Sequence, residues 1–317
     1  MKRAVLLGSL LSLACAPSPG DAGADAGALQ VDAGEADAGA TSLEAFADVG
    51  ASSEGIAIGT TGTGASVMYV GTMGDRIVQI TPDGTTSEFA RIDSPVGIAV
   101  RADGRLVVCA KHAPADGGAP ALFSIDGSGA VSPLVERGPS GETFGLTNFV
   151  AIAPDGSLVF TDSMANRVYR ADAEGANVAL VTDAVTFPNG LSFSPDGTAL
   201  YVASWDSQTL FTLPFDRASS RYGEPVVSIG GVRNVDGLVT TADGALVLVT
   251  STRGILLGTP GSDTTTALTA MRAIALPANG VFGDAAFGPN ALYLSALGQG
   301  TITRVMTEYS GAPLPSR

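Results

Sequence analysis

The stretch FPNGLSFSPDGTALYVAS, residues 187–204, contains two short β-rich runs joined by a Pro-Asp-Gly turn. Apolar and aromatic residues favour strands on both sides of the turn, and Asp-Gly is a frequent hairpin connection. The stretch therefore predicts a β-hairpin. The hairpin does not account for Asn189 just before the first run, because asparagine favours turns and is depleted in strands.

Five other segments of the chain repeat this hairpin. Turns of similar length occur in 97–110, 150–163 and 237–251, a longer one in 54–72 and a shorter one in 285–297. Two further short strands follow between copies, as in 76–90 and 167–182. Four strands roughly every 40–50 residues, repeated six times, are typical of a β-propeller.

The two ends of this repeat region complement each other. The last copy supplies only three clear strands, which end near 301–306, whereas residues 43–58 resemble 87–100 and begin with an outer strand. We therefore expect 43–48 to pair beside 301–306, which completes the last blade and covers its edge. The predicted fold is all-β: a closed six-bladed β-propeller of four antiparallel strands per blade over residues 42–317.

The N-terminal residues indicate export. Residues 1–15 begin with two basic side chains, followed by an apolar run over 4–14 that is too short to span a membrane. The stretch LSLAC resembles a bacterial lipobox, so we expect lipidation of Cys15; ordinary cleavage near Ala14 is the alternative. The predicted location is the bacterial cell envelope, lipid-anchored, facing the periplasm or the cell surface.

Residues 16–41 consist mostly of Ala, Gly and Asp, without an aromatic residue. Such a composition cannot bury enough apolar surface to fold, so we expect a disordered tether that reaches roughly 25–30 Å. The net charge of the chain is −14, and residues 51–317 hold 24 acids and 15 bases. This acidity argues against nucleic acid as a partner. We expect a monomer that contacts the membrane only through its lipid.

Cys109 is the second of the two cysteines in the chain. If Cys15 carries lipid, Cys109 has no partner for a disulfide, and stability has to come from the apolar core. Because Cys109 follows Val107 and Val108 within a strand-like run, we expect a buried, inert thiol rather than a nucleophile.

Asn189 lies in the loop from the outer strand of one blade to the inner strand of the next. Counting six residues back from the Pro or Ala of each turn reaches equivalent positions in the other repeats, and in the first repeat the residue before the matching Gly-Ile is Glu54. These positions hold Glu54, Val96, Asn148, Asn189, Asp236 and Gly283. Inner strands surround the central channel, so the four oxygen-bearing side chains are predicted to converge at one mouth.

Two carboxylates and two amide oxygens, without Cys or His, suit a hard divalent cation. Calcium fits best, and magnesium or manganese remains an alternative. Ordinary turn formation would explain any single Asn or Asp in this set. It explains Glu54 poorly, because glutamate is not a turn former.

Residues 42–306 resemble the family of calcium-dependent six-bladed propeller hydrolases that includes gluconolactonase, regucalcin and senescence marker protein. The resemblance rests on SEGIAI (53–58), TNFVAIAPDGSLVFTDS (147–163), FPNGLSFSPDGTALYVAS (187–204) and VDGLVTTADGALVLV (235–249). It implies metal ligands at Glu54, Asn148, Asn189 and Asp236. It also implies that Asp236 activates water, and GRLVVCAKH (104–112), which is similar to a gluconolactonase segment, adds His112.

Several family positions differ in this sequence. Phe149 replaces the acid that follows the first Asn, Ile56 and Ala57 replace an aromatic residue and a proline, and no Arg precedes Asn148. These differences predict an altered substrate pocket beside an intact metal site.

In a blade of four antiparallel strands, the loops between blades and the loops between the second and third strands open on one face. His112, Asp162, Trp205, Asp206 and Arg253 should therefore rim the mouth. His112 suits a proton shuttle or a substrate contact, or is an exposed loop histidine. Trp205 either stacks on a substrate ring or packs in its loop, and Arg253 is a candidate substrate contact. Asp162 is expected to brace backbone amides.

The sequence thus predicts metal-assisted hydrolysis of a small lactone or ester. In this scheme Asp236, or His112 through a water, takes the proton of the attacking water, while Asn148 and Asn189 hold cation and substrate oxygen. The alternative is a lipid-anchored, non-catalytic binding or scaffold propeller with a structural metal. A lyase on a similar propeller is the third possibility, but the single histidine argues against it.

Overall fold

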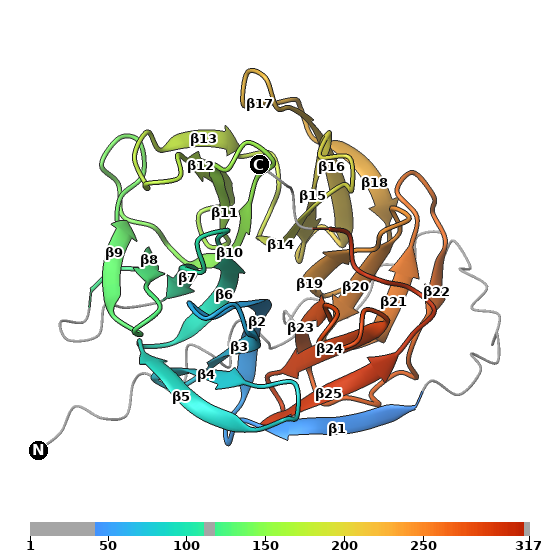
Figure 1. Ribbon diagram of the computed structural model, residues 1–317. Helices are drawn as coiled ribbons and strands as arrows, with labels where there is room; N and C mark the ends of the chain where they lie inside the picture. The colour runs from blue at the N-terminus through green and yellow to red at the C-terminus, as the bar shows by residue number, and fades with distance from the viewer. Residues whose placement is uncertain (1–41, 111–117, 314–317) are drawn as a thin grey trace, which may run out of the picture. The chain divides into compact units, whose positions relative to one another are not determined.

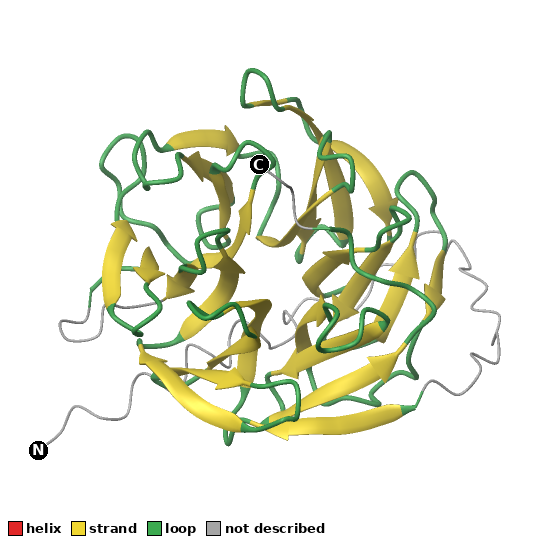
Figure 2. Cartoon of the chain, viewed as in Figure 1, coloured by secondary structure: helices red, strands yellow, loops and turns green. Residues whose placement is uncertain are grey.

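The computed structural model of the protein describes residues 42–110 and 118–313 (Figure 1). These ranges contain 25 β-strands and no helix (Figure 2). The strands form antiparallel sheets that follow one another around a central axis, which is where a β-propeller has its channel. This arrangement is a six-bladed β-propeller, as the repeat predicts. No helix in the described ranges is long and apolar enough to cross a bilayer.

The blades run outward from the channel in chain order. Blade 1 contains β2 (Ser53–Thr60), β3 (Ser66–Thr72), β4 (Arg76–Ile80) and β5 (Thr86–Arg91). Blade 2 contains β6 (Pro95–Val100), β7 (Leu106–Ala110), β8 (Ala121–Ile125) and β9 (Val131–Val135). Blade 3 contains β10 (Thr147–Ile152), β11 (Leu158–Asp162), β12 (Arg167–Ala171) and β13 (Ala179–Thr182). Blade 4 contains β14 (Pro188–Phe193), β15 (Ala199–Ser204), β16 (Thr209–Asp216) and β18 (Val226–Gly230), and β17 (Arg221–Tyr222) extends the end of β16. Blade 5 contains β19 (Val235–Thr240), β20 (Leu246–Thr250), β21 (Gly254–Gly258) and β22 (Thr265–Ala267). Blade 6 contains β23 (Pro277–Phe282), β24 (Ala291–Ala296), β25 (Thr301–Met306) and β1 (Leu43–Asp48).

Turn chemistry explains why the inner hairpins form. In the hairpin of β14 and β15, the Ser194 amide donates to the carbonyl of Ala199, and Gly197 has a positive φ of 69° that suits glycine. The Asp196 carboxylate accepts a hydrogen bond from the Thr198 amide at 3.1 Å. The Pro-Asp-Gly sequence thus fixes the turn locally, which is why it could be read before the structure.

The N-terminal strand closes the ring. β1 pairs antiparallel with β25, with Leu43 opposite Val305 and Asp48 opposite Thr301. Phe46 packs edge-on against Tyr293 with ring centroids 4.8 Å apart, and the guanidinium of Arg304 lies over the Phe46 ring, 5.6 Å from its centroid. Arg304 also forms an ion pair with Glu44 at 2.5 Å. The predicted closure is confirmed, and it covers the edge of β25.

The apolar core lies between neighbouring blades. One buried cluster, for example, combines Val159 and Val168 of blade 3 with Leu191, Val202 and Leu213 of blade 4. Each blade therefore buries both faces of its sheet, which accounts for the largely apolar inner strands. Packing on both sides holds every inner strand at a fixed height along the channel.

The sixth hairpin differs from its predicted bounds of 285–297. Its first strand is β23, and the turn spans 283–290, where the Asp284 carboxylate accepts the Ala286 amide at 2.9 Å. The register pairs Pro277 with Ala296 just as Pro188 pairs with Ser204. Ala278, not Gly283, is therefore equivalent to Asn189. The assignment of Gly283 was wrong because the count assumed a turn of constant length.

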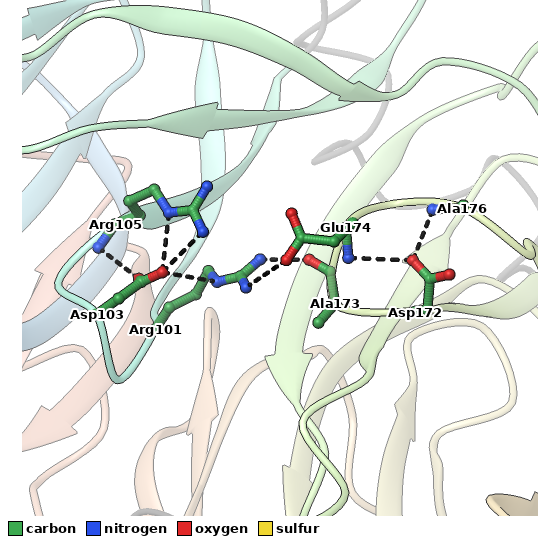
Figure 3. Close-up of polar contacts among 7 residues, drawn as sticks. All are labelled: Arg101, Asp103, Arg105, Asp172, Ala173, Glu174 and Ala176. Carbon is green, nitrogen blue, oxygen red and sulfur yellow. Dashed lines mark hydrogen bonds and ion pairs between the residues drawn. The ribbon is translucent and has the colours of Figure 1, made fainter.

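An arginine ties blades 2 and 3 together on the opposite face (Figure 3). Arg101 follows β6, and its guanidinium donates to the carbonyl of Ala173 and to the carboxylate of Glu174 at 3.3 Å in the turn between β12 and β13. The carboxylate of Asp103 accepts from Arg105 at 2.9 Å. A groove of about 580 Å³ lies beside this tie. In its lining, Arg101 pairs with Asp103 and Glu174, and Arg105 pairs with Asp103, so we describe it as an inter-blade contact region.

Candidate metal and substrate site

Four polar residues occupy one structural position at the start of the inner strands. Glu54, Asn148, Asn189 and Asp236 are each the second residue of β2, β10, β14 and β19. The strand register shifts at each of them, as in a β-bulge. A bulge redirects side chains locally, and here it does so at the channel mouth. The predicted equivalence of these four positions is confirmed.

Three of the four side chains form a hydrogen-bonded run across blades 3, 4 and 5. Asn148 Nδ2 donates to Asn189 Oδ1 at 3.1 Å, and Asn189 Nδ2 donates to Asp236 Oδ1 at 2.9 Å. All three residues are buried, with at most 6% of each exposed. Asn189 therefore does more than form a turn, because its amide joins the polar residues of two neighbouring blades.

Ser163 determines the orientation of the first amide in this run. Its hydroxyl donates to the carbonyl of Pro188 at 2.6 Å, so its oxygen is left to accept from Asn148 Nδ2 at 3.0 Å. Because the Ser163 oxygen can only accept from Asn148, the amide nitrogen of Asn148 must point toward Ser163, and its Oδ1 faces away. The hydrogen-bond network thereby assigns the direction of the amide.

Asp236 ends the run as a buried carboxylate between neutral groups. Its Oδ2 lies 3.5 Å from Ser251 Oγ, and its Oδ1 accepts from Asn189. The ion pairs of the described residues do not include it. Burial raises the pKa of Asp236 to about 7, and the hydrogen bonds from Asn189 and Ser251 lower it only in part. Such a carboxyl favours either a proton or a nearby cation.

Glu54 lies across the channel from Asn189, because blade 1 stands opposite blade 4 in the ring. Its backbone carbonyl accepts a hydrogen bond from Ser295 Oγ, which joins blade 1 to blade 6. Burial raises the pKa of the Cys109 thiol well above its ordinary value, and the charge of Glu54 adds to this effect.

The chemistry of this set fits a hard cation. The four side chains offer two carboxylates and two amide oxygens, and the buried Asp236 carboxylate lacks a basic partner among the described residues. Among residues 42–110 and 118–313, no cluster of three or more His, Cys, Asp or Glu side chains could hold a metal. Two of the four residues are amides, so the set would rely on amide oxygens and water to complete a coordination shell.

The predicted rim residues divide between described and undescribed segments. Trp205, between β15 and β16, and Arg253, between β20 and β21, both lie half-buried in loops on the face of the site. His112 lies outside the described residues, as do Cys15 and the boundaries at residues 15 and 41. The roles of Trp205, Arg253 and His112 stay predictions.

Two structural predictions near the site are confirmed. The buried carboxylate of Asp162 accepts the backbone amides of Gly145 at 2.9 Å and Leu146 at 2.8 Å, so it braces the loop before β10. Cys109 is fully buried, and its raised pKa keeps it a neutral thiol. Asp162 thus holds the loop before β10, and Cys109 is part of the apolar core.

Ser163 and Ser251 are the residues that sequence reasoning missed. Each directly follows the second strand of its blade and contacts the polar residue of the neighbouring inner strand. Their signal is positional: a serine stands at the same offset in the two repeats that carry Asn148 and Asp236. Serine is so common after strands that the offset alone would not single them out.

The model of the SMP-30/gluconolactonase/LRE-like region matches residues 54–296 of this sequence. The chain belongs to this family. The matched range begins at Glu54 and includes Asn148, Asn189 and Asp236. No functionally curated protein shows a significant sequence match to the chain.

Solved structures agree with the fold of the family. A gluconolactonase from Xanthomonas campestris superposes with a TM-score of 0.70 at 22% identity, covering 84% of this chain and 90% of that chain. A luciferin-regenerating enzyme gives 0.68 at 16% identity, covering 87% and 99%. The calcium-binding protein regucalcin from Agrobacterium tumefaciens gives 0.65 at 17% identity, covering 86% and 99%. At these identities the likeness concerns the fold alone.

Proposed function

We propose that this protein is a divalent-cation-dependent hydrolase of a small lactone or ester, anchored to the bacterial cell envelope. The observation that carries the proposal is the buried run from Asn148 through Asn189 to Asp236 at one mouth of the channel. Membership of a family that contains gluconolactonases supports a lactonase-type reaction.

Glu54, Asn148, Asn189 and Asp236 would hold the cation, and their all-oxygen set favours calcium over magnesium or manganese. A bound divalent cation would polarise the substrate carbonyl and stabilise the developing oxyanion. The regucalcin similar to this chain is described as a calcium-binding protein, which agrees with this choice.

The protein side chains account for the proton transfers. A water oxygen attacks the carbonyl carbon while its proton passes to the Asp236 carboxylate. The acyl C–O bond then breaks, and the leaving oxygen takes that proton to become the alcohol. Asn148 and Asn189 orient the reacting oxygens, because Ser163 and Asp236 fix their amides. His112 is a second candidate for the proton transfer, and Arg253 for a contact with the substrate.

The envelope location rests on residues 1–41. The apolar run before Cys15 supports export, and the lipobox-like LSLAC supports a lipid on that cysteine. The Ala/Gly/Asp-rich segment 16–41 would then act as a flexible spacer between lipid and propeller.

The test is a panel of lactones and aryl esters with and without a chelator. We expect cation-dependent hydrolysis that falls at least a hundredfold in Asp236→Asn, because this change removes the charge and the proton acceptor but keeps the shape. Asp155→Asn, the same change in the turn between β10 and β11 on the opposite face, should leave the rate unchanged. Full activity in Asp236→Asn would overturn the proposed mechanism. Cation binding without turnover of any substrate would favour the non-catalytic binding propeller, which the altered Ile56, Ala57 and Phe149 positions would then explain.

A further inference from the structure

One residue directly follows the second strand of every blade. In the described blades these residues are Met73, Ser163, Trp205, Ser251 and Leu297. Each backbone amide donates to a carbonyl just before the inner strand of its own blade. The bonds run from Met73 to Ser52 (2.8 Å), Ser163 to Leu146 (2.9 Å), Trp205 to Phe187 (3.1 Å), Ser251 to Asn234 (3.1 Å) and Leu297 to Leu276 (2.9 Å). The five positions are therefore equivalent.

The two serines show where a side chain at this position points. Ser163 reaches Asn148 at 3.0 Å, and Ser251 Oγ lies 3.5 Å from Asp236 Oδ2. Met73 packs against the apolar cluster that contains Val96, which occupies the position of Asn148 and Asn189 in blade 2. The five equivalent backbone positions form a second ring around the inner strands, and in blades 3 and 5 their side chains contact the polar residues of the mouth.

Three members of the second ring are large, apolar and partly exposed: Met73, Trp205 and Leu297. Trp205 and Leu297 belong to none of the buried apolar clusters of the described chain, and Trp205 to none of its aromatic pairs. Trp205 and Leu297 therefore do not belong to the apolar packing between the described blades.

The loops of the same face add exposed apolar side chains. Met164 directly follows Ser163 and is 64% exposed, and in the loop before β23 Met271 is 62% and Leu276 42% exposed. Exposed apolar side chains on the loops of a face with a polar centre can form the walls of a small-molecule pocket, where polar groups orient a ligand and apolar walls bury it.

We propose that the substrate carries an alkyl or aryl group beside its lactone or ester carbonyl, and that Met73, Trp205 and Leu297 bind this group. The proposal rests on the proposed function and specifies its substrate class. A polyhydroxylated sugar lactone fits this wall poorly, because hydroxyl groups placed against it would lose water without gaining partners. Each methylene that the wall covers should raise kcat/KM roughly fourfold.

The kinetic test compares γ-lactones of increasing alkyl chain length with glucono-δ-lactone, using the full-length protein with calcium. We expect kcat/KM to rise roughly fourfold per methylene over the first few carbons, and to exceed that for gluconolactone. Leu297→Gln should flatten this rise. Leu180→Gln, the same change at a 45% exposed leucine on the outer strand β13, should not. A flat series, or a preference for gluconolactone, would overturn the inference while leaving hydrolysis established.

A binding measurement keeps the inference testable if no substrate turns over. Trp205 is the only tryptophan of the chain, so its fluorescence reports this position alone. Titration with alkyl γ-lactams, which resist hydrolysis, should give a saturable change in emission whose midpoint falls with chain length. The midpoint should rise in Leu297→Gln and not in Leu180→Gln. Emission that stays constant for every lactam would contradict the proposal whatever the outcome for hydrolysis.

Discussion

The cation-free protein should lose stability as the pH rises from about 4 to about 7. Burial raises the pKa of Asp236 to about 7, whereas an unfolded aspartate titrates near 3.9. Between these values the folded state holds a proton that the unfolded state has released. Because the folded state then binds more protons, the free energy of unfolding decreases with pH and levels off above pH 7.

The size of the effect follows from the two pKa values. They differ by roughly three, and each unit corresponds to about 1.4 kcal/mol, so the ionised Asp236 costs about 4 kcal/mol at pH 8. For a domain of this size, that loss lowers the midpoint of thermal unfolding by roughly 10 °C. Asp236→Asn keeps an oxygen for the Asn189 amide but cannot ionise, so it should not show this decrease.

The assay is thermal and urea unfolding between pH 4 and pH 8 in the presence of a chelator. The wild type and Asp236→Asn are compared by the difference between their free energies of unfolding at each pH, because the contributions of the other titrating groups cancel in this difference. Asp155→Asn serves as the control: although desolvation raises the pKa of Asp155, hydrogen bonds from Ser157 and Ser220 leave it below the ordinary value. The contribution of Asp155 to the free energy of unfolding is therefore lost only at acid pH. Parallel curves for the wild type and Asp236→Asn would refute the reasoning.

Three further predictions concern the fold and the anchor. Phe46→Ala should destabilise the protein by about 2 kcal/mol in urea unfolding. Phe89→Ala is the control at the matching place in blade 1, where the Phe89 and Tyr69 ring centroids lie 4.8 Å apart, and it should have a similar effect. A much smaller effect at Phe46 would contradict closure by the N-terminal strand. Asp162→Ala should cost about 3 kcal/mol, because it removes the buried charged acceptor of the part-buried Gly145 and Leu146 amides. Near-neutral unfolding data would disprove the bracing role. Cys15→Ser should release the protein from the membrane fraction or leave a precursor of higher mass, and unchanged fractionation and mass would exclude lipidation.

The fold could be predicted because the sequence signals of its hairpins are local and are repeated six times along the chain. Each inner hairpin has its own turn residues, such as Asp196 and Gly197, and six copies of one hairpin imply a ring. The closing strand was readable for the same reason, since residues 43–48 resemble the outer strand β5. Where a turn departed from the common length, as at 283–290, counting residues failed and placed Gly283 where Ala278 lies.

Of the candidate site, the sequence predicted only the four polar residues at the start of the inner strands. Asn148, Asn189 and Asp236 share an offset from their turns, and Glu54 was recognised from the Gly-Ile that follows it. The hydrogen bonds that orient them do not have such a signature, because Ser163 reaches Asn148 and the next blade at once through the propeller's three-dimensional register. The raised pKa of Asp236 likewise depends on burial, which the sequence around it does not reveal.

Calorimetric titration of the chelator-treated full-length protein with calcium at pH 8 tests the central claim most directly. If Glu54, Asn148, Asn189 and Asp236 hold one cation as proposed, the wild type and Asp155→Asn should bind one ion per chain, Asn189→Ala at least tenfold more weakly, and Asp236→Asn none. A wild type that binds no divalent cation, or Asp236→Asn that binds calcium as tightly as the wild type, would contradict the account.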